Sequence, residues 1–187
     1  MPMRLLVGAI VLTMAVSAFG ETSSTLDFVI QVLEPTGGKI LRPRDWFYRE
    51  GHRGPTYRWT LSREDSNDQS YTTGVRIQMF VGVKEGTGKT AREFIADIAG
   101  SRKKAATKII SACGEQDQGV FTRICLETEE GLYHILYSLF WGNRNLDIAV
   151  VVTSGTTKDL WSTYSSVFKT MMGEFELIDT KRFDKQP

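Results

Sequence analysis

The clearest pattern in the chain is an alternation of apolar and polar positions over residues 75–83. The apolar positions are Val75, Ile77, Met79, Val81 and Val83. A period of two residues places these side chains on one face of an extended segment. The pattern therefore predicts a β-strand with one buried face.

A helical pattern follows this strand directly. Apolar residues recur there at the spacing of one helix face, namely Ala91, Phe94, Ile95, Ile98 and Ala99. Thr90 and Glu93 fit a capping box, in which each side chain bonds the backbone N–H of the other residue. The spacing and the cap together predict an amphipathic helix that begins after Thr90.

Short apolar segments predict further strands on both sides of this helix. Before it they are residues 26–33, residues 39–41 and 46–48 as one edge strand interrupted at Pro43, and residues 57–61. After it they are residues 107–113, 120–127, 132–141 and 146–153. Short, turn-rich separators between these last four predict an antiparallel meander. A second helix is expected near Thr157, and a last edge strand at residues 175–178. This order of elements predicts the α+β class, with helices packed on an antiparallel sheet.

The first twenty residues differ from the rest of the chain. Arg4 is their only charge, and residues 5–19 form an almost unbroken apolar run that ends in small residues. This composition predicts a secretory signal peptide over residues 1–20, cleaved after Ala18 or Gly20. A retained membrane anchor is the alternative, but the run is shorter than the roughly 20 residues that a spanning helix needs. We expect one domain over residues 21–187, exported to the periplasm or the extracellular space, with no membrane span.

Composition narrows the function classes. The 187 residues are 41% hydrophobic, and 23 basic side chains stand against 22 acidic ones. Removing residues 1–20 takes away Arg4 and no acidic residue, which leaves 22 of each. A neutral chain argues against a nucleic-acid partner, since binding to phosphates needs a surplus of Lys and Arg.

The segment at residues 37–46 carries a family resemblance. It contains Pro43-Arg44-Asp45-Trp46, in an opening strand of the type found in the PsbP-like, Mog-type superfamily. Together with the order of elements over about residues 25–178, the chain resembles that superfamily. The resemblance implies a central antiparallel sheet flanked by helices, an α/β/α sandwich. It also implies an accessory or adaptor role, and it brings no catalytic motif.

Residues 83–90 resemble a phosphate-binding P-loop because they end in Gly88-Lys89-Thr90 between a strand and a helix. The first glycine of that motif should stand at position 83, which is Val83. P-loops also sit in parallel sheets, whereas this chain predicts an antiparallel one. We interpret the segment as a turn in which Thr90 caps the helix, and we expect no ATP.

Cys113 and Cys125 are the only cysteines of the chain. An even number in an exported protein favours a disulfide. A hairpin turned at residues 114–119 would instead place Cys113 opposite Val120, too far from Cys125 for a bond. A disulfide and two buried thiols both remain open, and a catalytic thiol would have only His134 as its partner. Two histidines are too few for a metal site of their own, so we expect no metal and no cofactor.

Aromatic and basic residues gather between positions 42 and 59. Tyr, Trp and Arg dominate binding hot spots, so this segment is the candidate surface for a partner or ligand. Its candidate residues are Arg44, Trp46, Tyr48, His52, Tyr57 and Trp59. The alternative is that the aromatic face belongs to the core and the arginines form its solvated back.

These observations predict an exported, non-catalytic domain whose partner is another protein, acting in protein interaction or envelope assembly. The alternative is a small-ligand-binding protein or a hydrolase-type enzyme with a pocket near Trp46, His52 and Trp59.

Overall fold

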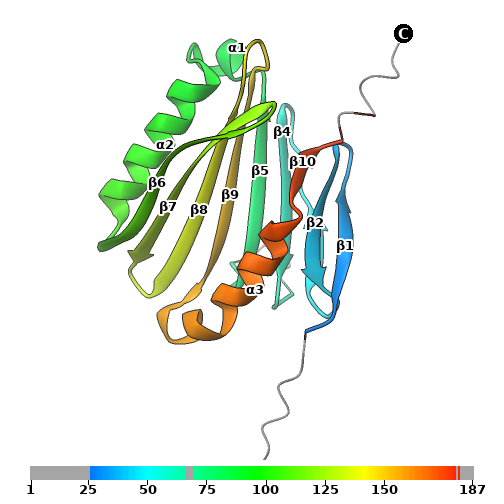
Figure 1. Cartoon of the computed structure of the whole chain (residues 1–187), viewed down its shortest axis with the longest axis vertical. Helices are drawn as coiled ribbons and strands as arrows, with labels where there is room; N and C mark the ends of the chain where they lie inside the picture. The colour runs from blue at the N-terminus through cyan, green and yellow to red at the C-terminus, as the bar shows by residue number, and fades with distance from the viewer. Residues whose placement is uncertain (1–25, 66–69, 180, 182–187) are drawn as a thin grey trace, which may run out of the picture.

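The computed structural model describes residues 26–65, 70–179 and 181, and these residues form three layers (Figure 1). A seven-stranded antiparallel sheet lies in the middle. Helix α2 covers one face, and helix α3 with a three-stranded sheet covers the other. The expected α+β class, with helices on an antiparallel sheet, is confirmed. The expected signal peptide lies outside the described residues. So do residues 66–69, which belong to an expected loop at residues 66–70.

The large sheet has the strand order β3-β4-β5-β9-β8-β7-β6. Its strands are β3 (Phe47–Glu50), β4 (Thr56–Ser62), β5 (Gly74–Val81), β6 (Lys108–Gln118), β7 (Phe121–Glu130), β8 (Tyr133–Gly142) and β9 (Ile148–Thr157). Strands β6 to β9 follow one another as neighbours, so the predicted meander is confirmed.

The small sheet consists of β1 (Phe28–Leu33), β2 (Gly37–Pro43) and β10 (Glu176–Ile178), with β2 in the centre. The prediction that residues 39–41 and 46–48 form one interrupted edge strand is wrong, because they belong to different sheets. Pro43 ends β2, and the Trp46 N–H donates to the Pro43 carbonyl at 3.0 Å in the turn that follows. This turn carries the chain from the small sheet to the edge of the large one.

Both faces of the large sheet are buried over part of their area. Val75, Ile77 and Met79 of β5 are at most 1% exposed and face α3 and the small sheet, as the alternation predicts. The strand ends two residues earlier than predicted, because Gly82 adopts a left-handed φ of 67°. Val83 therefore leaves the strand, begins the short helix α1 (Val83–Thr87) and packs in the second core beneath α2.

The two longer helices pack on opposite faces of the large sheet. Helix α2 (Ala91–Ala105) begins with the predicted capping box of Thr90 and Glu93. The segment expected as a turn before this helix instead forms α1 over Val83–Thr87, and only Gly88 to Thr90 connect the two helices; Lys89 pairs with Asp97. The second helix is preceded by a 3-10 turn, η1 (Lys158–Leu160), and runs as α3 (Trp161–Gly173).

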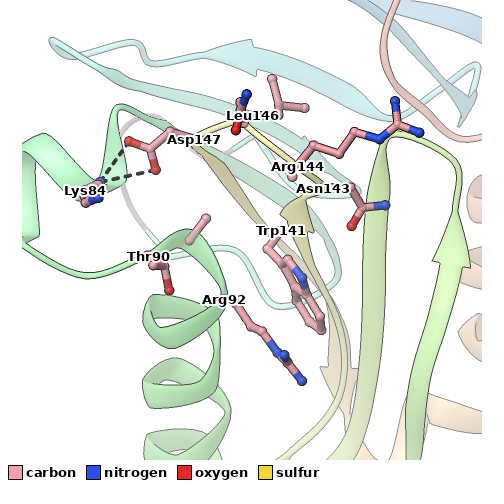
Figure 2. Close-up of a pocket in the computed structure, with 11 residues that line it drawn as sticks. Lys84, Thr90, Arg92, Trp141, Asn143, Arg144, Leu146 and Asp147 are labelled. Atoms are coloured by element: carbon pink, nitrogen blue, oxygen red, sulfur yellow. Dashed lines mark hydrogen bonds between the residues drawn. The ribbon is translucent and has the colours of Figure 1, made fainter.

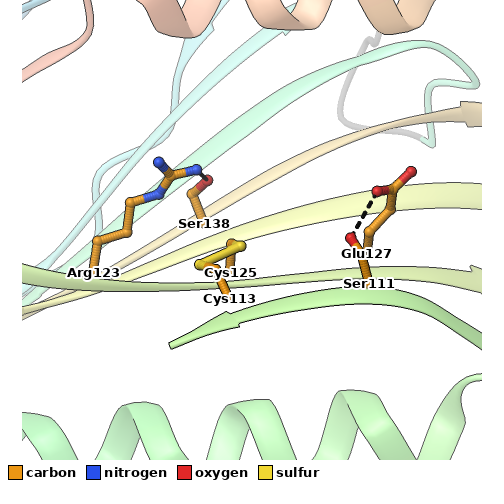
Figure 3. Close-up of a disulfide and its surroundings, with 6 residues drawn as sticks. All are labelled: Ser111, Cys113, Arg123, Cys125, Glu127 and Ser138. Atoms are coloured by element: carbon orange, nitrogen blue, oxygen red, sulfur yellow. Dashed lines mark hydrogen bonds between the residues drawn. A yellow bond between two sulfur atoms is a disulfide. The ribbon is translucent and has the colours of Figure 1, made fainter. Parts of the chain in front are cut away.

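Cys113 and Cys125 lie directly opposite each other on β6 and β7 and form a disulfide, with Cα atoms 5.0 Å apart (Figure 3). The expected register, with Cys113 opposite Val120, is wrong. Strand β6 continues to Gln118, which pairs with Phe121, so the turn lies at residues 119–120. The polar residues at 114–118 belong to an edge strand that is exposed on both faces, and for that reason they resembled a turn.

Candidate functional site

The two tryptophans of the predicted binding segment lie in the core. Trp46 is 3% exposed and Trp59 is 0% exposed. Trp46 packs against Tyr164 and Phe168 of α3, with ring centroids 6.1 and 6.2 Å away. The Trp59 indole N–H donates to the carbonyl of Glu34 at 2.8 Å. Both side chains thus tie the large sheet to the layer that covers it, as the core alternative describes.

Three of the predicted residues come together at the end of the β3–β4 hairpin. His52 lies 5.3 Å from Tyr57 and 5.4 Å from Trp59 between ring centroids, and the rings of Tyr57 and Trp59 stack at 6.1 Å. The Arg58 backbone N–H donates to His52 Nδ1, and His52 Nε2 lies 3.2 Å from a carboxylate oxygen of Glu50. This hairpin therefore presents His52 and Tyr57 above a buried tryptophan.

Tyr48 is linked to that cluster through the Glu50 carboxylate, which also contacts His52, whereas Arg44 lies apart from it. The Tyr48 hydroxyl donates to a Glu50 carboxylate oxygen at 2.6 Å, and burial together with this bond raises the pKa of Tyr48 well above its usual range. Arg44 is exposed and pairs with Asp27 at 2.6 Å. Of the six predicted residues, these two, His52 and Tyr57 could meet a partner without unpacking the core.

Arginines from three adjacent strands lie on the face of the sheet opposite Trp59. Arg49 of β3 faces Thr60 of β4, and Thr60 faces Arg76 of β5. Arg58 lies two residues before Thr60 on β4 and therefore on the same face. We call Arg49, Arg58 and Arg76 the arginine surface.

The arginine surface lies beyond the part of the sheet that α2 covers. Helix α2 packs over β7, β8 and β9 (Figure 1), whereas Arg58 is exposed and Phe47 of β3, on the same face, is 44% exposed. Arg58 and Phe47 are thus exposed on a face that α2 covers further along the sheet.

The charges of this surface are only partly balanced. Arg49 pairs with Asp65. The Arg76 guanidinium lies 5.2 Å from the ring centroid of Tyr71, and its buried Nε has no hydrogen-bond partner in the described part of the chain. Among those residues Arg58 and Arg76 form no ion pair. Arg58 and Arg76 therefore contribute positive charge to this surface.

The alternation at residues 57–59 predicts that Arg58 lies opposite Tyr57 and Trp59, but it gives no sign of Arg76. Arg76 is one of the polar positions of the β5 alternation, and only the pairing of β4 with β5 brings it beside the arginines of the earlier segment. The residues that surround the N-terminus of α2 were also missed as a group, because they come from residues 84–92 and from residues 141–147, which lie far apart in the chain.

In residues 26–65, 70–179 and 181, no group of three or more His, Cys, Asp and Glu side chains could hold a metal ion. Within the same residues, no helix is long and apolar enough to cross a membrane. Both cysteines are in the disulfide, and His134 Nε2 lies 2.7 Å from Glu127 Oε1 rather than beside a thiol.

No family model matches this chain, and no curated protein matches it. Among solved structures, the chain is similar to the solution structure of cyanobacterial PsbP (CyanoP) from Synechocystis sp. PCC 6803. The TM-score is 0.49 and the identity is 14%, over 83% of this chain and 95% of that chain.

Proposed function

We propose that residues 21–187 form an exported, non-catalytic accessory domain of the PsbP type that binds another protein through the arginine surface. The observation that carries the proposal is the alignment of exposed Arg58 with half-buried Arg49 and Arg76 on one face of three adjacent strands. Guanidinium groups make paired hydrogen bonds to carboxylates and are enriched in interface hot spots. The partner that fits this surface by charge is an acidic segment of a protein.

The predicted site residues have two roles in this proposal. Tyr48, His52 and Tyr57 belong to the β3–β4 hairpin on the face opposite the arginines, and Arg44 pairs with Asp27 outside this hairpin. Trp46 and Trp59 support the strands from the buried side. A rigid sheet would keep the arginines in place and lower the entropy lost on binding.

The test uses the mature protein and an acidic probe of defined composition, a short poly-glutamate peptide. Binding should weaken as salt is added, because exposed charges are screened. The double variant Arg58→Glu, Arg76→Glu should lose binding by at least about tenfold. Equal binding by this folded variant would exclude the arginine surface.

The matched control is Lys103→Glu, Lys169→Glu, which makes the same change in net charge at exposed positions on the helices. It should retain binding. If both double variants lose binding equally, the probe responds only to net charge.

Co-purification of the mature protein from its own compartment, with mass spectrometry of the proteins that co-purify, then identifies the natural partner.

Export to the periplasm or the extracellular space is part of the proposal. Support comes from the apolar run at residues 5–19 and from the disulfide, which persists in oxidising compartments and is rare in the cytosol. Fractionation and N-terminal sequencing of the native protein test this directly. A mature chain beginning at Phe19 or Glu21 is expected, and an intact residue 1 in a cytosolic fraction would contradict export.

A small-ligand-binding role is the second candidate, since the structure contains a cavity of suitable size. It lies at the N-terminal end of α2 and not near Trp46, His52 and Trp59.

A further inference from the structure

A cavity of about 550 Å³ lies between α1, the first turn of α2 and the loop that joins β8 to β9 (Figure 2). This is within the roughly 300–1,000 Å³ typical of small-ligand sites. Its lining residues are Lys84, Thr90, Ala91, Arg92, Trp141, Gly142, Asn143, Arg144, Asn145, Leu146 and Asp147. The cavity is separate from the arginine surface, which lies on β3, β4 and β5.

Positive charge predominates in this cavity. Lys84, Arg92 and Arg144 line it with one carboxylate, that of Asp147, and Arg92 pairs with Glu115 of β6. The Asp147 carboxylate already accepts the Lys84 backbone N–H, at 2.9 and 3.2 Å to its two oxygens. In the described part of the chain, neither Lys84 nor Arg144 forms an ion pair through its side chain. Two cations are thus available to an incoming anion.

An aromatic wall lies beside these charges. Trp141 is 8% exposed, and the Arg92 guanidinium lies 5.8 Å from its ring centroid. Figure 2 shows Arg92 running from the first turn of α2 past the lower edge of this ring, and Arg144 extending from the loop above the ring. Leu146 adds an apolar side chain to the lining. The cavity therefore offers a flat apolar contact next to charged groups.

The loop that carries Arg144 is held in one conformation. Asn143 N–H donates to the Val120 carbonyl at 2.9 Å, and Gly82 N–H donates to the Asp147 carbonyl at 2.9 Å. A Cβ on Gly142 would lie 2.1 Å from the Leu146 carbonyl oxygen, so no other residue fits there. A loop fixed in this way loses little entropy when a ligand binds.

We propose that this cavity binds a small organic anion, in which a carboxylate or phosphate group meets Lys84 and Arg144 and a flat apolar body lies against Trp141. The site does not rely on the backbone N–H groups at the N-terminus of α2, because Thr90 and Glu93 form a capping box there. The site is independent of the arginine surface and uses none of its residues.

The experiment is an NMR titration of the mature, nitrogen-15-labelled protein, followed at the indole N–H of Trp141. The probes are benzoate, phenyl phosphate, benzylamine and benzyl alcohol. Benzoate or phenyl phosphate should shift the Trp141 signal with a Kd of about 1 mM or lower. Whichever of the two binds more tightly identifies the acidic group.

The variants make the result specific to the cavity. Lys84→Gln, Arg144→Gln should weaken anion binding by at least about tenfold. The control Lys103→Gln, Lys169→Gln and the arginine-surface variant Arg58→Glu, Arg76→Glu should bind as the wild type does. The proposal is overturned by the absence of a saturable shift with either anion, by equal binding of the amine or the alcohol, or by unchanged binding in the folded cavity variant.

Discussion

The imidazole of His134 stacks face to face on the indole of Trp161, with ring centroids 3.7 Å apart and an angle of 7° between the planes. His134 lies in β8, and Trp161 is the first residue of α3, so this contact fixes where the helix leaves the sheet. Glu127 of β7 accepts from His134 Nε2 at 2.7 Å and from the hydroxyl of Ser111 in β6 at 2.9 Å. A single chain of contacts thus joins α3 to the edge of the large sheet.

Substitution Trp161→Ala should detach the start of α3 and lower the free energy of unfolding by about 2 kcal/mol. That is less than the roughly 3–5 kcal/mol expected for a fully buried tryptophan, because Trp161 is only half-buried. Urea denaturation measures the change, and Trp161→Phe should restore most of it by keeping a ring over His134. A Trp161→Ala variant as stable as the wild type would show that the stack contributes nothing.

The disulfide should stabilise the β6–β7 hairpin. Cys113 and Cys125 are 12 residues apart, and a cross-link over a loop of this length is worth about 3 kcal/mol in the chain-entropy model. The double variant Cys113→Ser, Cys125→Ser should unfold at lower urea concentration and show faster amide exchange in β6 than in β9. Dithiothreitol should destabilise the wild type and leave the double variant unchanged. Two titratable thiols in the untreated native protein would contradict the bond.

The strand β5 and the helix α2 could be predicted because each has one buried face. Burial imposes a period of two residues on the strand and the three- and four-residue spacing on the helix, and both periods can be read locally. Strand β6 has no buried face, so its residues follow no such period. The end of the strand, and with it the opposite position of Cys113 and Cys125, could not be found from local sequence.

The candidate surfaces were predictable to different degrees. The alternation around Trp59 correctly separates a core face from Arg58, but alternation does not say which face a partner would contact. The place of Arg76 depends on how β5 pairs with β4. The cavity depends on a meeting of α1, α2 and the β8–β9 loop, which only the tertiary fold brings about.

Acid should weaken the N-terminus of α2. The Thr90 backbone N–H donates to the Glu93 carboxylate at 2.9 Å and the Thr90 hydroxyl at 2.8 Å, and these bonds lower the pKa of Glu93. A carboxyl whose pKa is lower in the folded state than in the unfolded chain stabilises the protein at pH values above its unfolded pKa of about 4.3. This stabilisation is lost as pH falls through the folded pKa. NMR titration of Glu93 and amide exchange in the first turn of α2 measure both effects. The variant Glu93→Gln should remove the acid dependence at this turn, and an unchanged dependence would contradict the assignment.

Alkali should act through Tyr137. This residue is 1% exposed, and its hydroxyl donates to a Glu130 carboxylate oxygen at 2.8 Å. Burial, followed by this bond, raises the pKa of Tyr137. The contribution of the protonated Tyr137 hydroxyl to stability is therefore fully present at pH values below its unfolded pKa of about 10. This contribution is lost as pH rises toward and through the raised pKa of the folded state. Urea denaturation between about pH 9 and pH 11 should show a smaller loss of stability in Tyr137→Phe than in the wild type. The exposed residue Tyr133 provides the control, since Tyr133→Phe should follow the wild type.

The two tryptophans of the aromatic segment should behave as core residues. Trp59 is 0% exposed, so Trp59→Ala should lower the free energy of unfolding by about 3–5 kcal/mol, and Trp46→Ala by a similar amount. Trp59→Phe keeps most of the volume but loses the hydrogen bond to the Glu34 carbonyl, at a cost of about 1 kcal/mol. Tyr57→Ala, at the half-buried end of the same ring cluster, should cost less than either tryptophan. Urea denaturation of the four variants gives this order. A Trp59→Ala variant with a free energy of unfolding within about 1 kcal/mol of the wild type would mean that the ring is not packed as described. Trp59 would then be a candidate for contact with a partner.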